Sequence, residues 1–127
     1  MKMLVTAATE IELAALPRIP DYVTAVVTGV GIMETAYHFT RILCREKYDF
    51  VLNIGLCGTL RDEIKPGAVV QVGQETVADL GAEDDSRFID VFDLYLRESD
   101  VFPYQDKWMH NTLLLDDLPA VKGVTVN

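Results

Sequence analysis

The stretch YVTAVVTGVG, residues 22–31, is the clearest structural signal in the chain. From Tyr22 to Thr28 it is continuous and rich in β-branched residues, which predicts a strand that is buried on both faces. Gly29-Val30-Gly31 then ends the strand, and apolar residues recur beyond it at helical spacing. A strand that passes through a glycine turn into a helix is typical of an α/β fold.

The residues before this stretch predict another strand and another helix. Residues 2–8 form a short apolar run suited to a buried strand. Thr9, followed three positions later by Glu12, forms a capping-box pattern, so we expect a short helix to begin there. Pro17 and Pro20 end that helix.

The residues after the stretch repeat the alternation. One apolar stripe predicts an amphipathic helix that ends near Arg45. The stripe consists of Ile32, Ala36, Phe39 and Leu43. Residues 48–54 predict a third strand, closed by the loop 55–58. The order strand, helix, strand, helix, strand predicts an α/β sheet that is parallel at first.

The second half of the chain predicts a mixed extension of this sheet. Pro66-Gly67 marks a turn, and we expect strands over residues 68–72 and 121–127, with a further extended run over 76–78. Asp79, Glu83, Asp84 and Asp85 predict a solvated acidic loop rather than a metal site, because their spacing matches no calcium-binding loop. Residues 86–119 show poor periodicity, so we expect mostly loop with one short helical or extended piece.

Composition bounds the function. The chain has 127 residues, about one domain, and a net charge of −9, which disfavours nucleic acid and anionic membranes as partners because phosphate binding needs clustered positive charge. A nucleoside is compatible with that charge.

No run approaches a membrane span, and Glu10 and Glu12 interrupt the N-terminal apolar stretch before it resembles a signal peptide. Cys44 and Cys57 show no metal or redox spacing, so we expect reduced thiols in a cytoplasmic protein.

Two glycine motifs follow predicted strands. Gly29-Val30-Gly31 lacks both the third glycine of a dinucleotide fingerprint and a phosphate-loop lysine, so a helix-packing turn is the favoured interpretation. The loop 53–58 lies at the carboxyl end of a predicted central strand, where α/β sheets bind ligands, although a simple strand-ending bend explains it equally well. Cys57 has no local histidine partner and reads as a small packed thiol. His38 and His110 read as structural or exposed.

Glu12 has two interpretations. Its carboxylate can cap its own helix together with Thr9, which is worth about 1 kcal/mol. Alternatively, it lies just beyond the first strand and can hold a water for attack on an electrophilic carbon. Spacing alone favours the cap.

Taken in order, four segments resemble the nucleoside phosphorylase and nucleosidase superfamily. They are Val5–Glu12, Thr28–Gly31, Asn53–Gly58 and Pro66–Val70. Within that superfamily, Val77–Asp84 and Gly123–Asn127 are most similar to the futalosine hydrolases. Those enzymes split futalosine into hypoxanthine and a dehypoxanthinyl product on a menaquinone pathway.

The resemblance implies a catalytic role for Glu12. In the hydrolytic branch, the glutamate at this place orients the attacking water. The phosphorylases use glycine and arginine of the corresponding loop for phosphate, and this loop has no arginine, so hydrolysis is favoured. The resemblance also implies that two loops bind the substrate, through Ala8, Thr9, Leu56, Cys57 and Gly58. Cys57 replaces the small residue usual in the family.

The resemblance further implies a three-layer α/β/α fold around a mixed sheet, a homodimer or larger homo-oligomer, and no cofactor or metal. No residue here matches the family's purine-protonating aspartate or its methionine–glutamate pair for the ribose. We therefore expect residues 1–127 to be the N-terminal part of one nucleosidase-like domain, with an incomplete fold and little or no hydrolase activity. The alternatives are a methylthioadenosine or adenosylhomocysteine nucleosidase, or a non-catalytic fragment that dimerises or binds a nucleoside.

Overall fold

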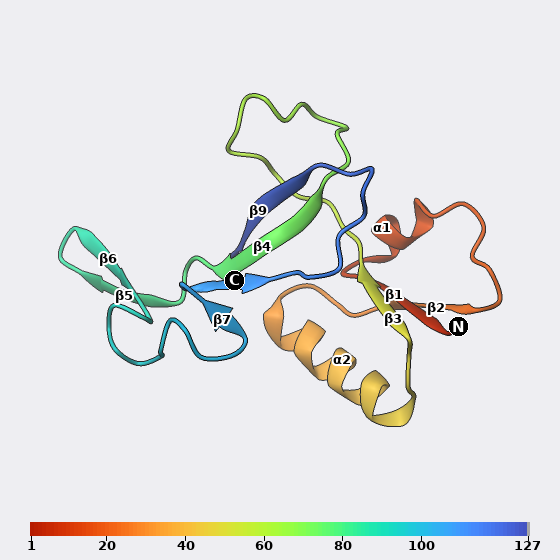
Figure 1. The fold of residues 1–127 in the computed structure, drawn as a ribbon, viewed down its shortest axis with the longest axis horizontal. Helices are drawn as coiled ribbons and strands as arrows, with labels where there is room; N and C mark the ends of the chain where they lie inside the picture. Colours follow the sequence, from red (N-terminus) through yellow and green to blue (C-terminus); the bar gives the residue numbers. More distant parts are fainter. Residues whose placement is uncertain (127) are drawn as a thin grey trace. The chain divides into compact units, whose positions relative to one another are not determined.

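A computed structural model describes residues 1–126 of the chain. The chain divides into two compact units, Met1–Leu60 and Arg61–Asn127 (Figure 1). Both units contain sheets, and the two helices are in the first, so the protein has a mixed α/β fold with a low helix content. The expected strand over residues 121–127 ends at Asn127, which lies outside the described residues.

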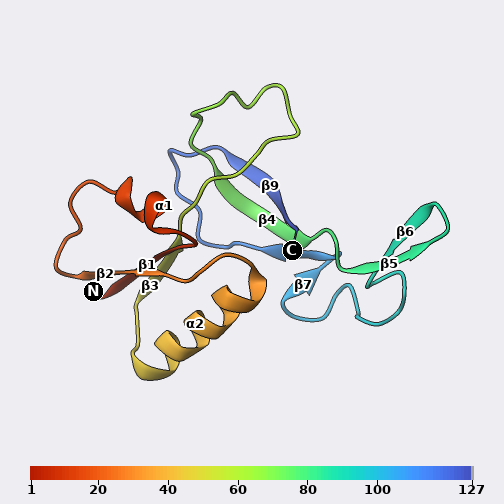
Figure 2. The ribbon, with the colours of Figure 1, turned by 180° about the vertical axis from the view of Figure 1, so that it is seen from behind.

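The first unit alternates strands and helices as its sequence predicts. Its elements are β1 (Met3–Ala7), α1 (Glu10–Ala14), β2 (Val23–Val27), α2 (Ile32–Arg45) and β3 (Phe50–Asn53). The three strands form one parallel sheet in the order β2-β1-β3, with Leu4 opposite Thr24 on one side and Val51 on the other. Right-handed crossovers in this order place the two helices on opposite sides of the strands, as Figures 1 and 2 show.

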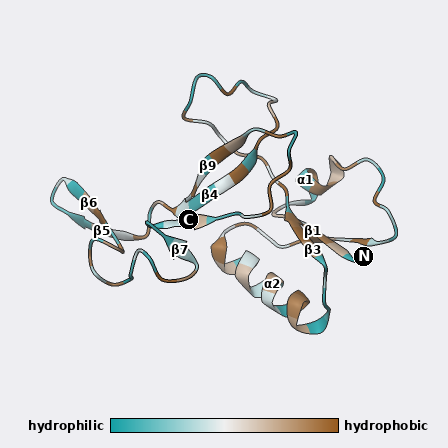
Figure 3. Ribbon diagram, viewed as in Figure 1, coloured by the Kyte–Doolittle hydropathy of each residue, from teal (hydrophilic) through white to brown (hydrophobic). Residues whose placement is uncertain are grey.

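The core of the first unit is centred on β1. Leu4, Val5, Thr6 and Ala7 are buried, and Thr28 beyond β2 is buried beside them. Figure 3 shows the hydrophobic residues that run along β1 and β3. The expected burial of residues 22–28 on both faces is wrong for β2, which is half-buried throughout because it is an edge strand.

Helix α2 forms over the predicted residues, but its predicted stripe is only partly covered. Phe39 is half-buried, whereas Ile32, Ala36 and Leu43 are exposed. The other half-buried residues of this helix are Thr35, His38 and Ile42. The covered face is therefore rotated from the one that hydrophobicity alone indicates, and it includes the half-buried His38.

The second unit is built around β4 (Gln71–Val77). It pairs antiparallel with β8 (Trp108–His110) and parallel with β9 (Ala120–Thr125), and β8 also pairs with β7 (Tyr104–Gln105). The mixed character predicted for this half is confirmed, but the expected extension of the first sheet is wrong, because these strands form sheets separate from β2-β1-β3. The predicted strand boundary at residue 68 is wrong, because the Pro66-Gly67 turn extends to an Ala68 N–H bond with the Lys65 carbonyl.

The expected acidic loop over residues 79–85 is also wrong. Gly81–Asp84 is strand β5, which pairs antiparallel with β6 (Arg87–Asp90) around a turn where Asp85 has a φ of 55°. The side chains of β5 are exposed, so its acidic residues are solvated as expected. Backbone pairing rather than burial forms this hairpin, and hydropathy therefore gave no strand signal.

Neither described helix is long and apolar enough to span a membrane.

Candidate functional site

The carboxyl ends of β1 and β3 form the candidate site. Strands β2 and β3 lie on opposite sides of β1 in the sheet. The connections along the chain therefore run in opposite directions from β1, and the reversal lies between β1 and β3. Open α/β sheets bind ligands in the crevice at such a reversal. The hydroxyl of Thr6 donates to Asn53 Oδ1 at 3.0 Å and joins the last paired residues of the two strands.

A capping box turns the Glu12 side chain back toward this edge. Thr9 has extended backbone angles, φ −136° and ψ 157°, and its Oγ1 accepts a hydrogen bond from the Glu12 N–H at 3.3 Å. In return, Glu12 Oε2 accepts from the Thr9 N–H at 2.9 Å and from the Thr9 hydroxyl at 2.8 Å. The capping box predicted from the spacing is confirmed.

The other carboxylate oxygen of Glu12 reaches the loop after β3. The Leu56 N–H donates to Glu12 Oε1 at 2.9 Å, across 44 positions of sequence. Gly55 allows this approach, because a Cβ at that position would lie 3.0 Å from Oε1. The helix cap and the position at the sheet edge are therefore two properties of one carboxylate, which links the β1 and β3 loops.

These hydrogen bonds keep Glu12 ionised. The Leu56 N–H and then the Thr9 hydroxyl hold the pKa of the Glu12 carboxyl below its ordinary value, and the Thr9 and Ala8 amides act in the same direction. Desolvation by the surrounding residues opposes them and does not reverse the shift. A carboxylate of low pKa is a weak base, but it accepts hydrogen bonds from water and stabilises a nearby positive charge.

The remaining predicted site residues belong to the same two loops. Ala8 contributes its amide to the Glu12 carboxylate, as just described, and is half-buried. Cys57 and Gly58 continue the loop beyond Leu56 and are exposed, with open space around Gly58. The interpretation of Cys57 as a packed thiol is wrong, because the loop leaves the sheet directly after Ile54. Cys44 is a free, exposed cysteine as well.

Sequence reasoning missed the particular contributions of Gly55 and of the Leu56 backbone. The motif 53–58 was a candidate because of its glycines and its place after a strand, and that signal was sufficient to find the loop. The Leu56 N–H that holds Glu12 is a backbone group, so its function carries no residue-type signature. Only the pairing of β1 with β3 brings it to the carboxylate.

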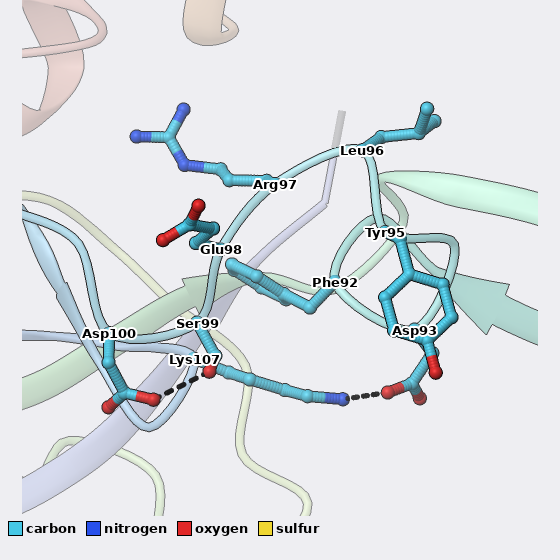
Figure 4. A pocket seen from close by; sticks show the side chains of 9 residues that line it. All are labelled: Phe92, Asp93, Tyr95, Leu96, Arg97, Glu98, Ser99, Asp100 and Lys107. Atoms are coloured by element: carbon cyan, nitrogen blue, oxygen red, sulfur yellow. Dashed lines mark hydrogen bonds and ion pairs between the residues drawn. The ribbon is translucent and has the colours of Figure 1, made fainter.

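The second unit has an open concavity of about 770 Å³ (Figure 4). It is lined by Phe92, Asp93, Tyr95, Leu96, Arg97, Glu98, Ser99, Asp100 and Lys107. The Lys107 ammonium lies 2.7 Å from an Asp93 oxygen and 2.9 Å from an Asp90 oxygen, so its charge is already matched. These contacts tie the segment after β6 to the β7–β8 turn, which is a structural role.

Asp90 is expected to make the second unit sensitive to acid. The amides of Asp93 and Phe92 and the Lys107 ammonium hold the pKa of Asp90 below its ordinary value of 3.8. The stabilisation is therefore present above that value and is lost as the pH falls through the lower pKa of the folded state. Asp90→Asn should lower the stability at pH 7 by about 1 kcal/mol, a difference that shrinks below pH 3.8. Urea titrations followed by Trp108 fluorescence measure both effects.

The matched control for this substitution is Asp84→Asn, which makes the same change at an exposed position of the β5–β6 hairpin. It should leave the free energy of unfolding within about 0.5 kcal/mol of the wild-type value. An Asp90→Asn chain as stable as the parent at pH 7 would show that the Lys107 contacts are incidental.

Comparison with known proteins gives no match, since no family model, curated protein or solved structure is significantly similar to this chain. The residues available for a functional proposal are therefore those of the Glu12 edge and the motifs quoted from the sequence. They place an ionised carboxylate, held from two loops, at the sheet edge where α/β proteins bind ligands.

Proposed function

We propose that this chain contains the water-orienting part of a purine nucleoside hydrolase site, with Glu12 as the group that orients the water. The observation that carries the proposal is the attachment of one ionised carboxylate to both the Thr9 and the Leu56 loops. The resemblance of these loops to the nucleosidase superfamily supplies the reaction and the substrate class. Futalosine is the substrate that the subfamily resemblance favours.

The geometry suits the chemistry of N-ribosyl hydrolysis. The bond between the anomeric carbon and the purine nitrogen breaks, its electron pair leaves with the purine, and the ribose carries positive charge in the transition state. Water then forms the new carbon–oxygen bond and loses a proton, while the purine gains one. Glu12 would orient that water and stabilise the cationic sugar, and neither task needs a strong base. The low pKa of Glu12 is therefore compatible with its proposed role.

Nucleoside binding is the first test, because the sequence offers no match to the family's purine-protonating aspartate. Isotope-labelled protein is titrated with futalosine, methylthioadenosine and adenosylhomocysteine, with uridine as the control ligand. Futalosine should shift the amide resonances of Thr9, Leu56 and Gly58, and uridine should not. If no purine nucleoside shifts these resonances, the site is not a nucleoside site.

Turnover is the second test. Hypoxanthine release from futalosine is assayed with residues 1–127 and with the chain as its source cell produces it. We expect little or no release from residues 1–127, and release by the cellular form. Binding without turnover in both forms would favour a non-catalytic nucleoside-binding protein. A preference for methylthioadenosine or adenosylhomocysteine over futalosine would favour the alternative nucleosidase.

The proposal extends to the architecture and the assembly. The family fold has three layers, α/β/α, and the helices on opposite sides of β1–β3 support that arrangement for the first unit. The family also forms homodimers or larger homo-oligomers. Sedimentation of the purified chain at several concentrations tests that assembly, and a concentration-independent monomer would exclude it.

A further inference from the structure

The two oxygens of the Glu12 carboxylate have different surroundings. Oε2 accepts two hydrogen bonds from Thr9, one from its N–H and one from its hydroxyl. Because a carboxylate oxygen offers about two lone-pair sites, Oε2 is fully occupied. Oε1 accepts a hydrogen bond from the Leu56 N–H at 2.9 Å, and the Ala8 amide acts on the carboxylate as a whole.

The backbone of Gly55 lies close to Oε1. A Cβ at position 55 would approach Oε1 to 3.0 Å, so glycine lets the loop come this near without a tight contact. Gly55 and Leu56 are exposed, and a water molecule can therefore reach Oε1 from solvent. Oε2 faces Thr9 and its helix turn instead.

We infer that Thr9 is a positioning residue for the proposed hydrolysis, because it occupies Oε2 and thereby leaves Oε1 as the oxygen that holds the attacking water. The expected effect of Thr9 on catalysis rests on the proposed function. Its effect on the orientation of the Glu12 carboxylate does not. Thr9 acts through Glu12 and does not itself contact the water. Without the Thr9 hydroxyl, Oε2 keeps only its hydrogen bond from the backbone N–H of residue 9, and the carboxylate is held less firmly.

Valine and serine at position 9 separate the hydroxyl from the rest of the side chain. Thr9→Val keeps the shape, the backbone N–H and a β-branched residue where the backbone is extended, and it removes only the hydroxyl contacts. Thr9→Ser keeps the hydroxyl and loses the methyl group. The pair therefore tests the hydroxyl with similar backbone preferences.

Two readouts distinguish positioning from a general structural effect. Carbon-13 titration of the Glu12 carboxyl should show a raised pKa in Thr9→Val and a near-normal value in Thr9→Ser. In the form of the protein that releases hypoxanthine, kcat should fall about 10- to 100-fold in Thr9→Val with little change in KM. The kcat of Thr9→Ser should stay close to that of the parent. A purely structural defect would change KM and folding as well.

Gly55→Ala tests the other oxygen. The added methyl group would lie 3.0 Å from Oε1 and push this oxygen and the Leu56 loop apart, whereas the Thr9 contacts are with the other oxygen. We expect a fall in kcat comparable with that of Thr9→Val, in a chain whose α1 helix stays intact by amide chemical shifts. A Gly55→Ala protein with full kcat would overturn the assignment of Oε1.

The outcomes separate this inference from the proposed function. If no nucleoside is hydrolysed by any form, the proposed function fails, and a raised Glu12 pKa in Thr9→Val still supports the positioning role. If the parent is active and Thr9→Val changes neither kcat nor the Glu12 pKa, the inference fails and the function stands. If Thr9→Val does not fold, the serine variant decides. Normal folding and kcat in Thr9→Ser would support the role of the hydroxyl, and an equal defect in Thr9→Ser would refute it.

Discussion

Replacing Glu12 with glutamine is expected to lower the rate of nucleoside hydrolysis by about 10²–10⁴-fold in the catalytically active form of the protein. Glutamine keeps the size of the side chain but removes its charge and turns one oxygen into a donor. Whichever way the amide is placed, its NH₂ faces either the Thr9 donors or the Leu56 N–H. The negative charge that would stabilise the cationic sugar is lost in both placements, and the oxygen proposed to hold the water is lost in the second, whereas nucleoside binding should change little.

The control for this prediction is Glu10→Gln, the same charge change at an exposed position in the first turn of α1. It should leave turnover near the parent value. Full turnover in Glu12→Gln would exclude the proposed role. Loss of folding in Glu12→Gln, with normal folding in Glu10→Gln, would mean that the helix cap is the whole function of Glu12.

The pH profile of the parent gives an independent check on Glu12. Its pKa lies below the ordinary glutamate value of 4.5, so the carboxylate is ionised throughout the neutral range. Loss of kcat/KM through protonation of Glu12 is therefore expected only below pH 4.5, with no effect of this group between pH 5 and 8. A steep loss near pH 6 would assign the essential ionisation to another residue.

Replacing Leu4 with alanine is expected to be the most damaging change to the first unit. Leu4 has no exposed surface and lies on the central strand, between β2 and β3. Truncation of a buried leucine costs about 2–5 kcal/mol, which is a large part of the stability of a small domain. The melting temperature of this unit should fall by roughly 8 °C or more.

Leu60→Ala is the matched control, because Leu60 is 98% exposed and loses the same atoms. Circular dichroism and hydrogen exchange of the β1 amides report on the first unit, whereas Trp108 fluorescence reports on the second. Leu4→Ala should change the first two signals most. Equal effects of Leu4→Ala and Leu60→Ala would show that β1 is not the centre of the core.

Much of the first unit was predictable, because its signals are local. A β-branched run, a capping box and glycine turns each act within a few residues, and the elements from β1 to β3 follow them. The rotation of the covered face of α2 was not predictable, since the burial of its residues depends on their tertiary surroundings and not on the helix alone. Strands β5 and β6 were missed for a related reason, because exposed acidic residues form a strand only when a partner strand supplies the backbone hydrogen bonds.

The candidate site was predictable as two loops but not as one arrangement. The spacing of Thr9 and Glu12 predicts their mutual hydrogen bonds, since both lie in one helix turn. The contact with Leu56 depends on the strand order β2-β1-β3, which no short motif specifies. The exposure of Cys57 likewise depends on where the chain turns after β3.

The 44 positions from Glu12 to Leu56 also set the order in which the contacts of the site form. The Thr9 contacts span three positions of sequence. The Leu56 contact forms only when β3 pairs with β1, which requires a much longer stretch of chain to close. A ribosome that adds about 5–20 residues per second completes Leu56 roughly 2–9 s after Glu12. During synthesis, the carboxylate is therefore held by its own helix first, and its second oxygen gains its partner only when the third strand arrives.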